Sequence, residues 1–439
     1  MKKLLLLLIL IGIIVGQEVN DLASSDAVTE TQNVEAIIEK FPEDYIRESI
    51  AASLAKKGKA LGTINDDGSV YIIGSATTAV PSNASGFIAS RNAAFSIAVL
   101  NAKINFLRLS GEQITSSRNV STMENLVEGS DPDAVAKASK LKKASMIVDK
   151  NLDKALGELG VSQTEISRMN AGKKEAIYSQ KFFEQTQSLV AGLLRGVSVV
   201  RIAEGESGSR DYQVSVVVKY SPDYLKLAST IMSNANYQLD PKQPSSTLDK
   251  IKNASPEDLI SRLGTSIIID ENGNMVVLGY GQQAVRKTTR RQSSAVSNAT
   301  SRARLQAINN IKNFVSEDLI GDELFQQSEK ISEYIDGGQQ YFSQELWKNA
   351  IESKSTTLNI ASYVMKQWRG IHPDSKQELV GVIVAWTPEF AAQSKQMKEL
   401  LTKPNSALLD NQNSKKKSKP ADKNTKKGKV RISGQDGEL

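Results

Sequence analysis

The chain of 439 residues contains no cysteine and a single histidine. The absence of cysteine excludes disulfide bonds, thiol catalysis and lipid attachment through a thiol, and a lone histidine excludes metal sites built from several imidazoles. Long apolar runs are also scarce: residues 4–15 form one, and it is shorter than the ~20 residues that cross a bilayer. We therefore expect no cofactor, no metal site and no transmembrane span once a signal segment is removed.

Positive charge is concentrated near the end of the chain. The formal net charge is +6, and residues 414–439 hold eight Lys and one Arg against three acidic residues. The rest of the chain is close to neutral, so nucleic acid is not an expected partner, because phosphate affinity needs cations gathered on the folded surface. Residues 404–439 lack apolar periodicity and are expected to form a disordered, lysine-rich tail.

The first residues have the pattern of a secretory signal peptide. Two lysines precede the apolar run, and residues 1–16 have the length and order expected of a cleaved segment. An uncleaved anchor is the alternative. Residues 17–31 are polar and predict a flexible leader, and the expected location of the mature chain is periplasmic or extracellular.

The remainder of the chain repeats itself. Residues 212–220 alternate apolar and polar side chains before Ser-Pro-Asp-Tyr, and residues 380–386 do so before Thr-Pro-Glu-Phe, at an offset of 166. Extended segments precede them at 196–203 and 361–368. Each copy is therefore predicted to end in a β-hairpin.

The two copies also begin alike. Residues 61–74 and 263–279 each place an acidic-Gly or Asn-Gly turn before an apolar strand. A helical pattern follows in each copy, with a stripe of small residues that we match at an offset of 209: Ala94, Ala98 and Ala102 in the first copy, and Ala303, Ala307 and Ile311 in the second. Spacing of four places these residues on one face, and alanine there lets a helix approach a sheet closely.

These patterns predict an α+β fold made of two tandem related domains, each an antiparallel sheet packed by an alanine-faced helix. The first domain is assigned to residues 32–233, with a helical insertion near 130–170 that is rich in Ala, Lys and Leu. Residues 234–256 contain three prolines and are interpreted as a linker. The second domain is assigned to residues 257–403.

One stretch supports a resemblance to a known family. Residues 299–307 read Ala-Thr-Ser-Arg-Ala-Arg-Leu-Gln-Ala, and paired final strands end at Trp386. This order resembles the LPP20-like envelope lipoproteins and the related N-terminal domain of the flagellar T-ring protein. The resemblance implies an α+β module of envelope or flagellar-base assemblies, with no catalytic residues to transfer. Those relatives are commonly anchored through a cysteine, which this chain lacks, and the first copy has Phe95 where the second has Arg304.

Residues that could carry chemistry are few, and we assign none as catalytic. His372 lies in Ile-His-Pro between two strands and is expected to be a solvated loop residue. Gly279 and Gly281 flank a tyrosine but lack the third glycine of a nucleotide-binding fingerprint. Two acidic pairs fall at predicted turns, where carboxylates commonly serve the backbone: Asp66 with Asp67, and Asp270 with Glu271.

Two cationic clusters are candidate anion-binding or partner-binding sites. The first has four cations in six residues just before the second alanine helix, and the other begins the lysine-rich tail. Their residues are Arg286, Lys287, Arg290 and Arg291 in the first cluster, and Lys415, Lys416 and Lys417 in the second. An ordinary solvated loop and a solubilising tail are the alternatives.

The function that we expect is that of an exported, non-catalytic cell-envelope scaffold or binding protein, in a periplasmic or outer-membrane-associated assembly. Its partners would be envelope proteins or an anionic envelope polymer, and copies could also assemble with each other into a homo-oligomer. The alternative is a polysaccharide-acting envelope hydrolase that uses Asp or Glu in the groove between the two domains.

Overall fold

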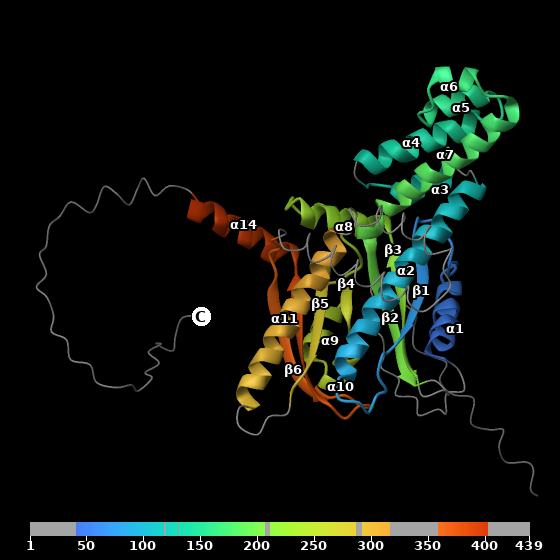
Figure 1. The fold of residues 1–439 in the computed structure, drawn as a ribbon. Helices are drawn as coiled ribbons and strands as arrows, with labels where there is room; N and C mark the ends of the chain where they lie inside the picture. Colours follow the sequence, from blue (N-terminus) through green and yellow to red (C-terminus); the bar gives the residue numbers. More distant parts are fainter. Residues whose placement is uncertain are drawn as a thin grey trace, which may run out of the picture. The chain divides into compact units, whose positions relative to one another are not determined.

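Two antiparallel sheets organise the chain (Figure 1). The computed structural model describes residues 41–117, 120–130, 132–206, 211–286, 292–316 and 359–402. The strands are β1 (Val70–Thr77), β2 (Val197–Glu206), β3 (Tyr212–Tyr220), β4 (Gly264–Ile269), β5 (Met275–Ala284), β6 (Tyr363–Ile371) and β7 (Glu378–Trp386). The helices are α1 (Pro42–Ala55), α2 (Phe87–Ser117), α3 (Val120–Val127), α4 (Pro132–Ile147), α5 (Leu152–Glu158), α6 (Gln163–Ser167), α7 (Ala171–Ala191), η2 (Leu194–Gly196), α8 (Pro222–Met232), α9 (Thr247–Asn253), α10 (Pro256–Ile260), α11 (Gln292–Ser316) and α14 (Pro388–Thr402). Residues up to Gln393 form one compact unit, and those from Ser394 onward form a second unit.

The two sheets share one topology, and the fold is α+β. The first has the order β1-β3-β2 and the second the order β4-β5-β7-β6, so β5, β7 and β6 repeat the first sheet and β4 is an addition. Both terminal hairpins are confirmed, and each carries a bulge at the same place, opposite Val218 of β3 and Val384 of β7. An equivalent bulge at an equivalent position is the mark of a duplicated unit.

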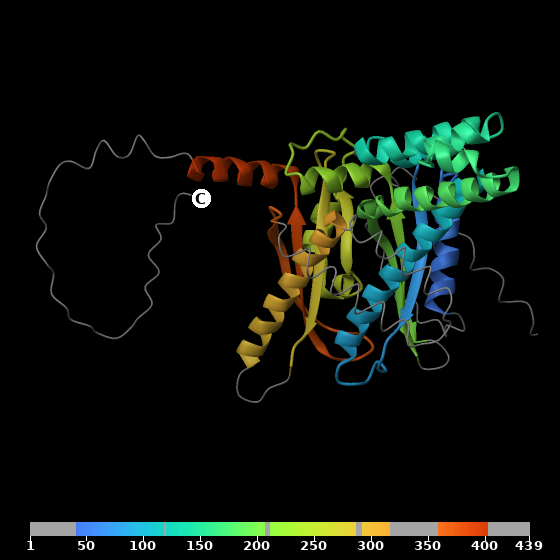
Figure 2. The ribbon, with the colours of Figure 1, turned by 45° about the horizontal axis from the view of Figure 1, so that its top comes forward.

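One alanine-bearing helix covers the front face of each sheet, α2 on the first and α11 on the second (Figures 1 and 2). The contact is close because glycines face alanines. A Cβ on Gly74 would lie 2.1 Å from the carbonyl oxygen of Ala98, and a Cβ on Gly281 would lie 1.9 Å from that of Ala303. No side chain larger than hydrogen fits in either strand without moving the helix.

This contact corrects the offset expected for the helices. Val70 pairs with Tyr220 in the first sheet, whereas Val277 pairs with Trp386 in the second. When β3 and β7 are matched, Ala98 therefore corresponds to Ala303, an offset of 205 rather than 209. The error is one helical turn, because a stripe that repeats every four residues matches itself equally well after such a shift.

Short helices cover the opposite faces. Ile46 and Ile50 of α1 pack with Tyr71 and Val217 on the back of the first sheet. On the second sheet this place is taken by α9 and α10, and Ile251 of α9 is only 1% exposed in a core that includes Leu278 of β5. The range 234–256, interpreted above as a linker, thus contains a helix that packs against the second sheet.

The two repeats pack on each other. The free edge of β2 faces β4, where the Ser198 hydroxyl donates a hydrogen bond to the Thr265 carbonyl oxygen at 2.9 Å. The last helix of the first repeat, α8, places Leu227 and Ala228 in the same core cluster as Ile311 of α11. The repeats therefore share apolar cores, and both belong to one compact unit.

The helical insertion stands out from the first repeat as an arm formed by α3 to α7 (Figure 1). The helical insertion predicted near 130–170 is present: this range holds α4, α5 and α6, and α7 leads back to the sheet. Side chains cap the N-termini of three of its helices: Asn151 caps α5, Ser162 forms a capping box on α6, and Asn170 caps α7. The buried apolar side chains of the arm belong to the same core cluster as the contact between α2 and the first sheet; they include Leu141, Leu156, Leu159 and Phe182.

Within the described residues, no helix combines the length and the apolarity needed to cross a membrane.

Candidate polar network between the repeats

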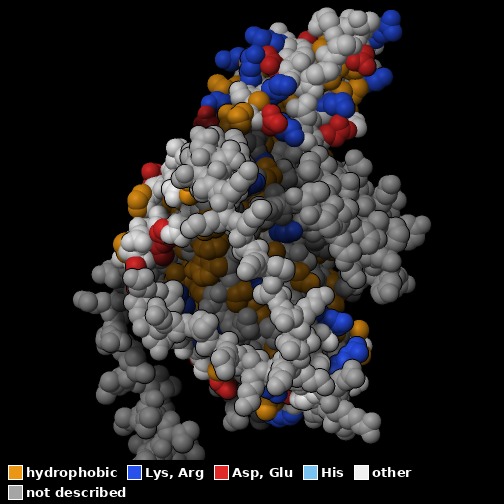
Figure 3. All heavy atoms as spheres, turned by 90° about the vertical axis from the view of Figure 1, so that its left-hand side faces the viewer, with side chains coloured by type: hydrophobic (Ala, Val, Ile, Leu, Met, Phe, Trp, Pro, Cys, Tyr) orange, Lys and Arg blue, Asp and Glu red, His pale blue; other side chains and the backbone are white. Residues whose placement is uncertain are grey.

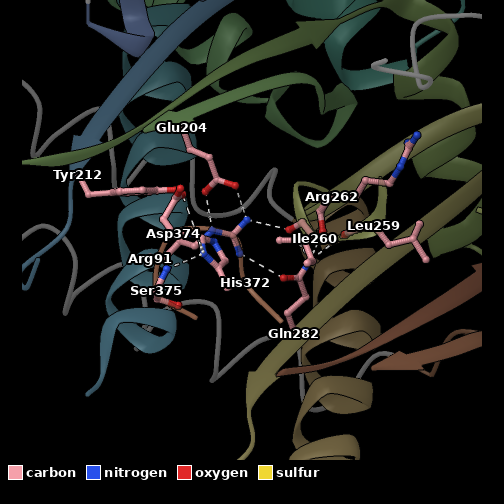
Figure 4. A network of polar contacts seen from close by, with 10 residues as sticks. All are labelled: Arg91, Glu204, Tyr212, Leu259, Ile260, Arg262, Gln282, His372, Asp374 and Ser375. Carbon is pink, nitrogen blue, oxygen red and sulfur yellow. Dashed lines mark hydrogen bonds and ion pairs between the residues drawn. The ribbon is translucent and has the colours of Figure 1, made fainter. Parts of the chain in front are cut away.

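A buried arginine lies at the centre of the junction between the two repeats (Figure 4). Arg91, in the second turn of α2, is 0% exposed. Its Nε and Nη2 each donate to one oxygen of Glu204 on β2, both at 2.5 Å. A planar guanidinium matches a carboxylate in this two-point geometry, and the pairing compensates the buried charge of Arg91, while the Glu204 side chain is 13% exposed.

The same guanidinium reaches the second repeat. Nη1 donates to Oε1 of Gln282 on β5 at 3.1 Å, and Nη2 donates to the Ile260 carbonyl oxygen at 2.8 Å. Burial alone lowers the pKa of Arg91, but the Glu204 carboxylate outweighs it and raises that pKa above its usual value. Arg91 therefore stays charged and joins strands of both repeats.

Gln282 completes the connection by holding the end of α10. Its Nε2 donates to the carbonyl oxygens of Leu259, Ile260 and Arg262, at 3.0, 2.9 and 2.8 Å. The last carbonyls of a helix have no partner within it, so a side chain that caps them fixes where the helix lies. The backbone oxygen of Gln282 accepts a further bond from Nδ2 of Asn92, the residue after Arg91.

A second set of contacts comes from the turn between β6 and β7. Its residue His372 is 0% exposed and packs edge-on against Phe87 of α2, with 5.3 Å between ring centroids. The hydroxyl of Tyr212 on β3 donates to Asp374 at 3.0 Å, and Nε2 of Gln377 donates to the Ala84 carbonyl oxygen at 2.6 Å. Burial raises the pKa of the Tyr212 hydroxyl, so the tyrosine remains a donor.

The expectation of a solvated His372 is wrong. Its neighbours Ile371 and Pro373 are exposed, as a turn between two strands suggests, but the imidazole points back into the first repeat. Local pattern shows only that a turn is present, and the burial depends on packing between segments 285 residues apart in the chain, Phe87 and His372. The sequence around His372 gives no local signal of this burial.

One carboxylate of each acidic pair, Asp270 in the second copy and Asp67 in the first, serves the backbone of its turn as expected, whereas Glu271 is hydrogen-bonded to Asp249. Oδ1 of Asp270 accepts bonds from the amides of Asn272 and Asn274 at 2.9 and 2.8 Å. Oδ1 of Asp67 accepts from the amide of Ser69 at 3.1 Å, and its other oxygen pairs with Lys59 at 2.6 Å. The described residues contain no group of three or more His, Cys, Asp or Glu that could hold a metal ion.

The glycines of β5 serve packing. Gly279 and Gly281 both pack against the backbone of α11. Both are paired with β7 in the sheet, so their amides do not form a loop that could hold phosphate. A small cavity of about 70 Å³ lies between α2, α11 and the facing edges of β2 and β4. It has room for about two water molecules.

Of the residues in the two cationic clusters, the structure describes Arg286. Arg286 follows β5 and is exposed. The other proposed residues lie outside the described residues: Lys287, Arg290, Arg291, Lys415, Lys416 and Lys417. The signal segment, the leader and the lysine-rich tail lie outside them as well.

Comparison with known proteins adds a family match and one solved structure. Residues 138–233 match a domain of unknown function, DUF6844. The match runs from α4 through the rest of the arm and the β2–β3 hairpin to the end of α8. A 2.3 Å crystal structure of a hypothetical protein from Francisella tularensis is similar at 19% identity and a TM-score of 0.47, over 83% of this chain and 95% of that one. No curated protein matches the chain significantly.

Proposed function

We propose that this chain is an exported, non-catalytic cell-envelope scaffold or binding protein. The observation that carries the proposal is how the charged residues are used. The buried charge of Arg91 is neutralised by Glu204, and the same guanidinium joins the two repeats through its bonds to Gln282 and Ile260. Acidic residues at the hairpin turns hold the backbone. Such a body provides a firm support for a surface that contacts a partner.

The arm is the part of the chain that we assign to this contact. In the view of Figure 3, Lys and Arg side chains are spread over the arm among Asp and Glu side chains. Residues 120–191 hold ten basic and ten acidic residues, so the arm carries exposed cations without a net charge. Lys140, Lys150 and Lys154 are exposed on or beside α4 and α5. The partner class that we propose is an anionic envelope polymer or an acidic protein surface, since exposed cations attract polyanions without a shaped pocket. The resemblance to envelope and flagellar-base modules is consistent with this assignment.

Binding to isolated envelope material tests the proposal. The full-length chain would be sedimented with purified peptidoglycan sacculi and, separately, with vesicles that contain lipopolysaccharide. A variant with Lys140, Lys150 and Lys154 changed to Glu is expected to lose at least tenfold in binding to whichever material retains the wild type. The control carries the same charge change at three exposed cations outside the arm, Lys56, Lys250 and Arg302, and should bind like the wild type.

Two outcomes would contradict the proposal. One is that the wild type sediments with neither material, and the other is that the arm and control variants lose binding equally. The second would move the contact away from the arm, and Arg290→Glu with Arg291→Glu would then test the cationic cluster before α11.

A further inference from the structure

The turn that joins β6 and β7 forms a latch between the repeats. Residues 371–377 belong to the second repeat, yet their side chains bond to the first. Gln377 donates to the Ala84 carbonyl oxygen, Asp374 accepts from Tyr212, and His372 packs on Phe87. The latch therefore closes the same junction as Arg91, from the opposite repeat.

The hydrogen bonds around His372 require a neutral imidazole. Its Nδ1 faces the backbone amides of Asp374 and Ser375, at 3.3 and 3.4 Å, and accepts from both. An imidazolium carries a proton on each nitrogen and cannot accept. Protonation of His372 thus places three donors against one another and breaks the bonds that shape the turn.

The other ring nitrogen offers no compensation. Nε2 is buried and has no hydrogen-bond partner within the described part of the chain. A proton there already lacks an acceptor in the neutral form. A charged ring would lose its hydration without gaining a new bond, which is the most costly arrangement for a buried ionised group.

Charges near the imidazole come from four elements. The guanidinium of Arg91 on α2 and the ammonium of Lys376 in the turn disfavour a second positive charge, while Asp374, 4.0 Å from Nδ1, favours it. Glu204 on β2 is already engaged by Arg91, and Tyr212 on β3 faces the ring as a neutral hydroxyl. Burial, and then Arg91, lowers the pKa of His372 from its ordinary 6.5 to about 4.

We propose that residues 371–377 are an acid-released latch, in which uptake of one proton by His372 expels the turn from the first repeat and loosens the junction between the repeats. This latch is a property of the junction and goes beyond the proposed scaffold function. Between the ordinary and the folded pKa, each drop of one pH unit should shift the closed-to-released equilibrium about tenfold toward release.

Nuclear magnetic resonance tests the first half of this inference directly. His372 is the single histidine of the chain, so ¹³C labelling at the histidine Cε1 of a full-length, untagged protein gives one resonance that needs no assignment. We expect that resonance to titrate below pH 5. A titration near pH 6.5 would show a solvated imidazole and would overturn the inference.

Hydrogen exchange tests the second half. Amides of residues 84–91 and 371–377, corrected for the intrinsic pH dependence of exchange, should lose protection at the pH where the imidazole titrates. In His372→Gln, which carries no titrating group, protection should persist to lower pH, whereas in Tyr212→Phe the midpoint should still follow the histidine. Loss of protection at the same pH in His372→Gln would refute the latch. If His372→Gln fails to fold, the wild type alone tests the latch. The latch is then refuted if the midpoint of the histidine titration and the midpoint of the loss of amide protection differ by more than one pH unit.

Discussion

Replacing Gly281 by alanine would test the close packing of α11 on the second sheet. The new Cβ would lie 1.9 Å from the Ala303 carbonyl oxygen and 2.8 Å from the Ala307 nitrogen, and both of these are backbone atoms of the helix. Neither can rotate away as a side chain would. To restore a contact of ordinary length, about 3.4 Å, the helix has to move off the strand by roughly 1.5 Å.

The loss in free energy of unfolding can be estimated from the gap that this movement opens between α11 and the sheet. Ala303, Ala307, Ile311 and Phe314 of α11 are all 0–2% exposed, so the gap appears beneath a fully packed face. Overpacking a core costs ~1–3 kcal/mol, and movement of the helix as a whole places this variant at the upper end, about 3 kcal/mol. With a urea dependence of about 3 kcal/mol per M, the midpoint of unfolding should fall by ~1 M.

Gly157 provides the matched control. It lies in α5 of the arm, and a Cβ there would meet no atom within 4 Å. Gly157→Ala should therefore stabilise the arm by about 0.5–1 kcal/mol, because alanine has less freedom to lose in a helix. Urea unfolding followed by circular dichroism compares the two variants. If Gly281→Ala unfolds at the wild-type urea concentration, α11 does not press on β5 and the duplicated glycine contact has no energetic meaning.

Three other perturbations address the junction. Glu204→Ala leaves the Arg91 guanidinium buried without its carboxylate and should cost about 3–5 kcal/mol in thermal unfolding, whereas Glu204→Leu combined with Arg91→Met should recover most of that loss. Gln282→Leu removes three bonds to the end of α10, so residues 254–263 should become at least tenfold more sensitive to limited proteolysis, and unchanged cleavage would contradict the capping role. Because the pKa of His372 is lower in the folded chain, the unfolded chain binds the proton first; the free energy of unfolding should fall by up to about 3 kcal/mol as the pH drops from 6.5 to 4, and calorimetry of His372→Gln should lack that part.

The strands could be predicted from the sequence because their signals are local. Alternation before Ser-Pro and Thr-Pro marked the ends of β3 and β7, since Pro at the first helical turn stops a strand and begins a helix. The turn residues marked the end of β4 and the start of β5. Gly273 in this turn has a φ of +81°, which other residues rarely adopt.

The offset between the two alanine helices was harder to predict, because the small residues recur at a constant spacing of four. A helix with small residues every four positions looks the same after a slip of one turn, so the sequence alone allows offsets of 205 and 209 equally well. Pairing of β5 with β7 decides between them, and that pairing joins segments more than 90 residues apart. Register between distant strands leaves no trace in either strand read alone.

The junction network could not be found from local pattern for a related reason. Arg91 sits in an otherwise ordinary helical stretch, and its partners Glu204, Ile260 and Gln282 come from three separate elements. The pairing is visible only when both repeats are folded against each other. Local sequence does not distinguish a buried arginine from an exposed one.

The way in which the repeats join also bears on how a scaffold of this kind could grow. The edge of β2 meets β4, which is a contact between unlike surfaces, and such contacts continue to further copies unless an end is closed. The corresponding edge of the first repeat is closed, because Gln113 accepts from the Ile64 amide at 2.8 Å and donates to the Gly62 carbonyl oxygen at 2.6 Å. A side chain that occupies backbone groups in this manner prevents another strand from adding there. Assembly through that edge is therefore disfavoured, which is consistent with our proposal that a partner contacts the arm, whose exposed face carries charge rather than open backbone.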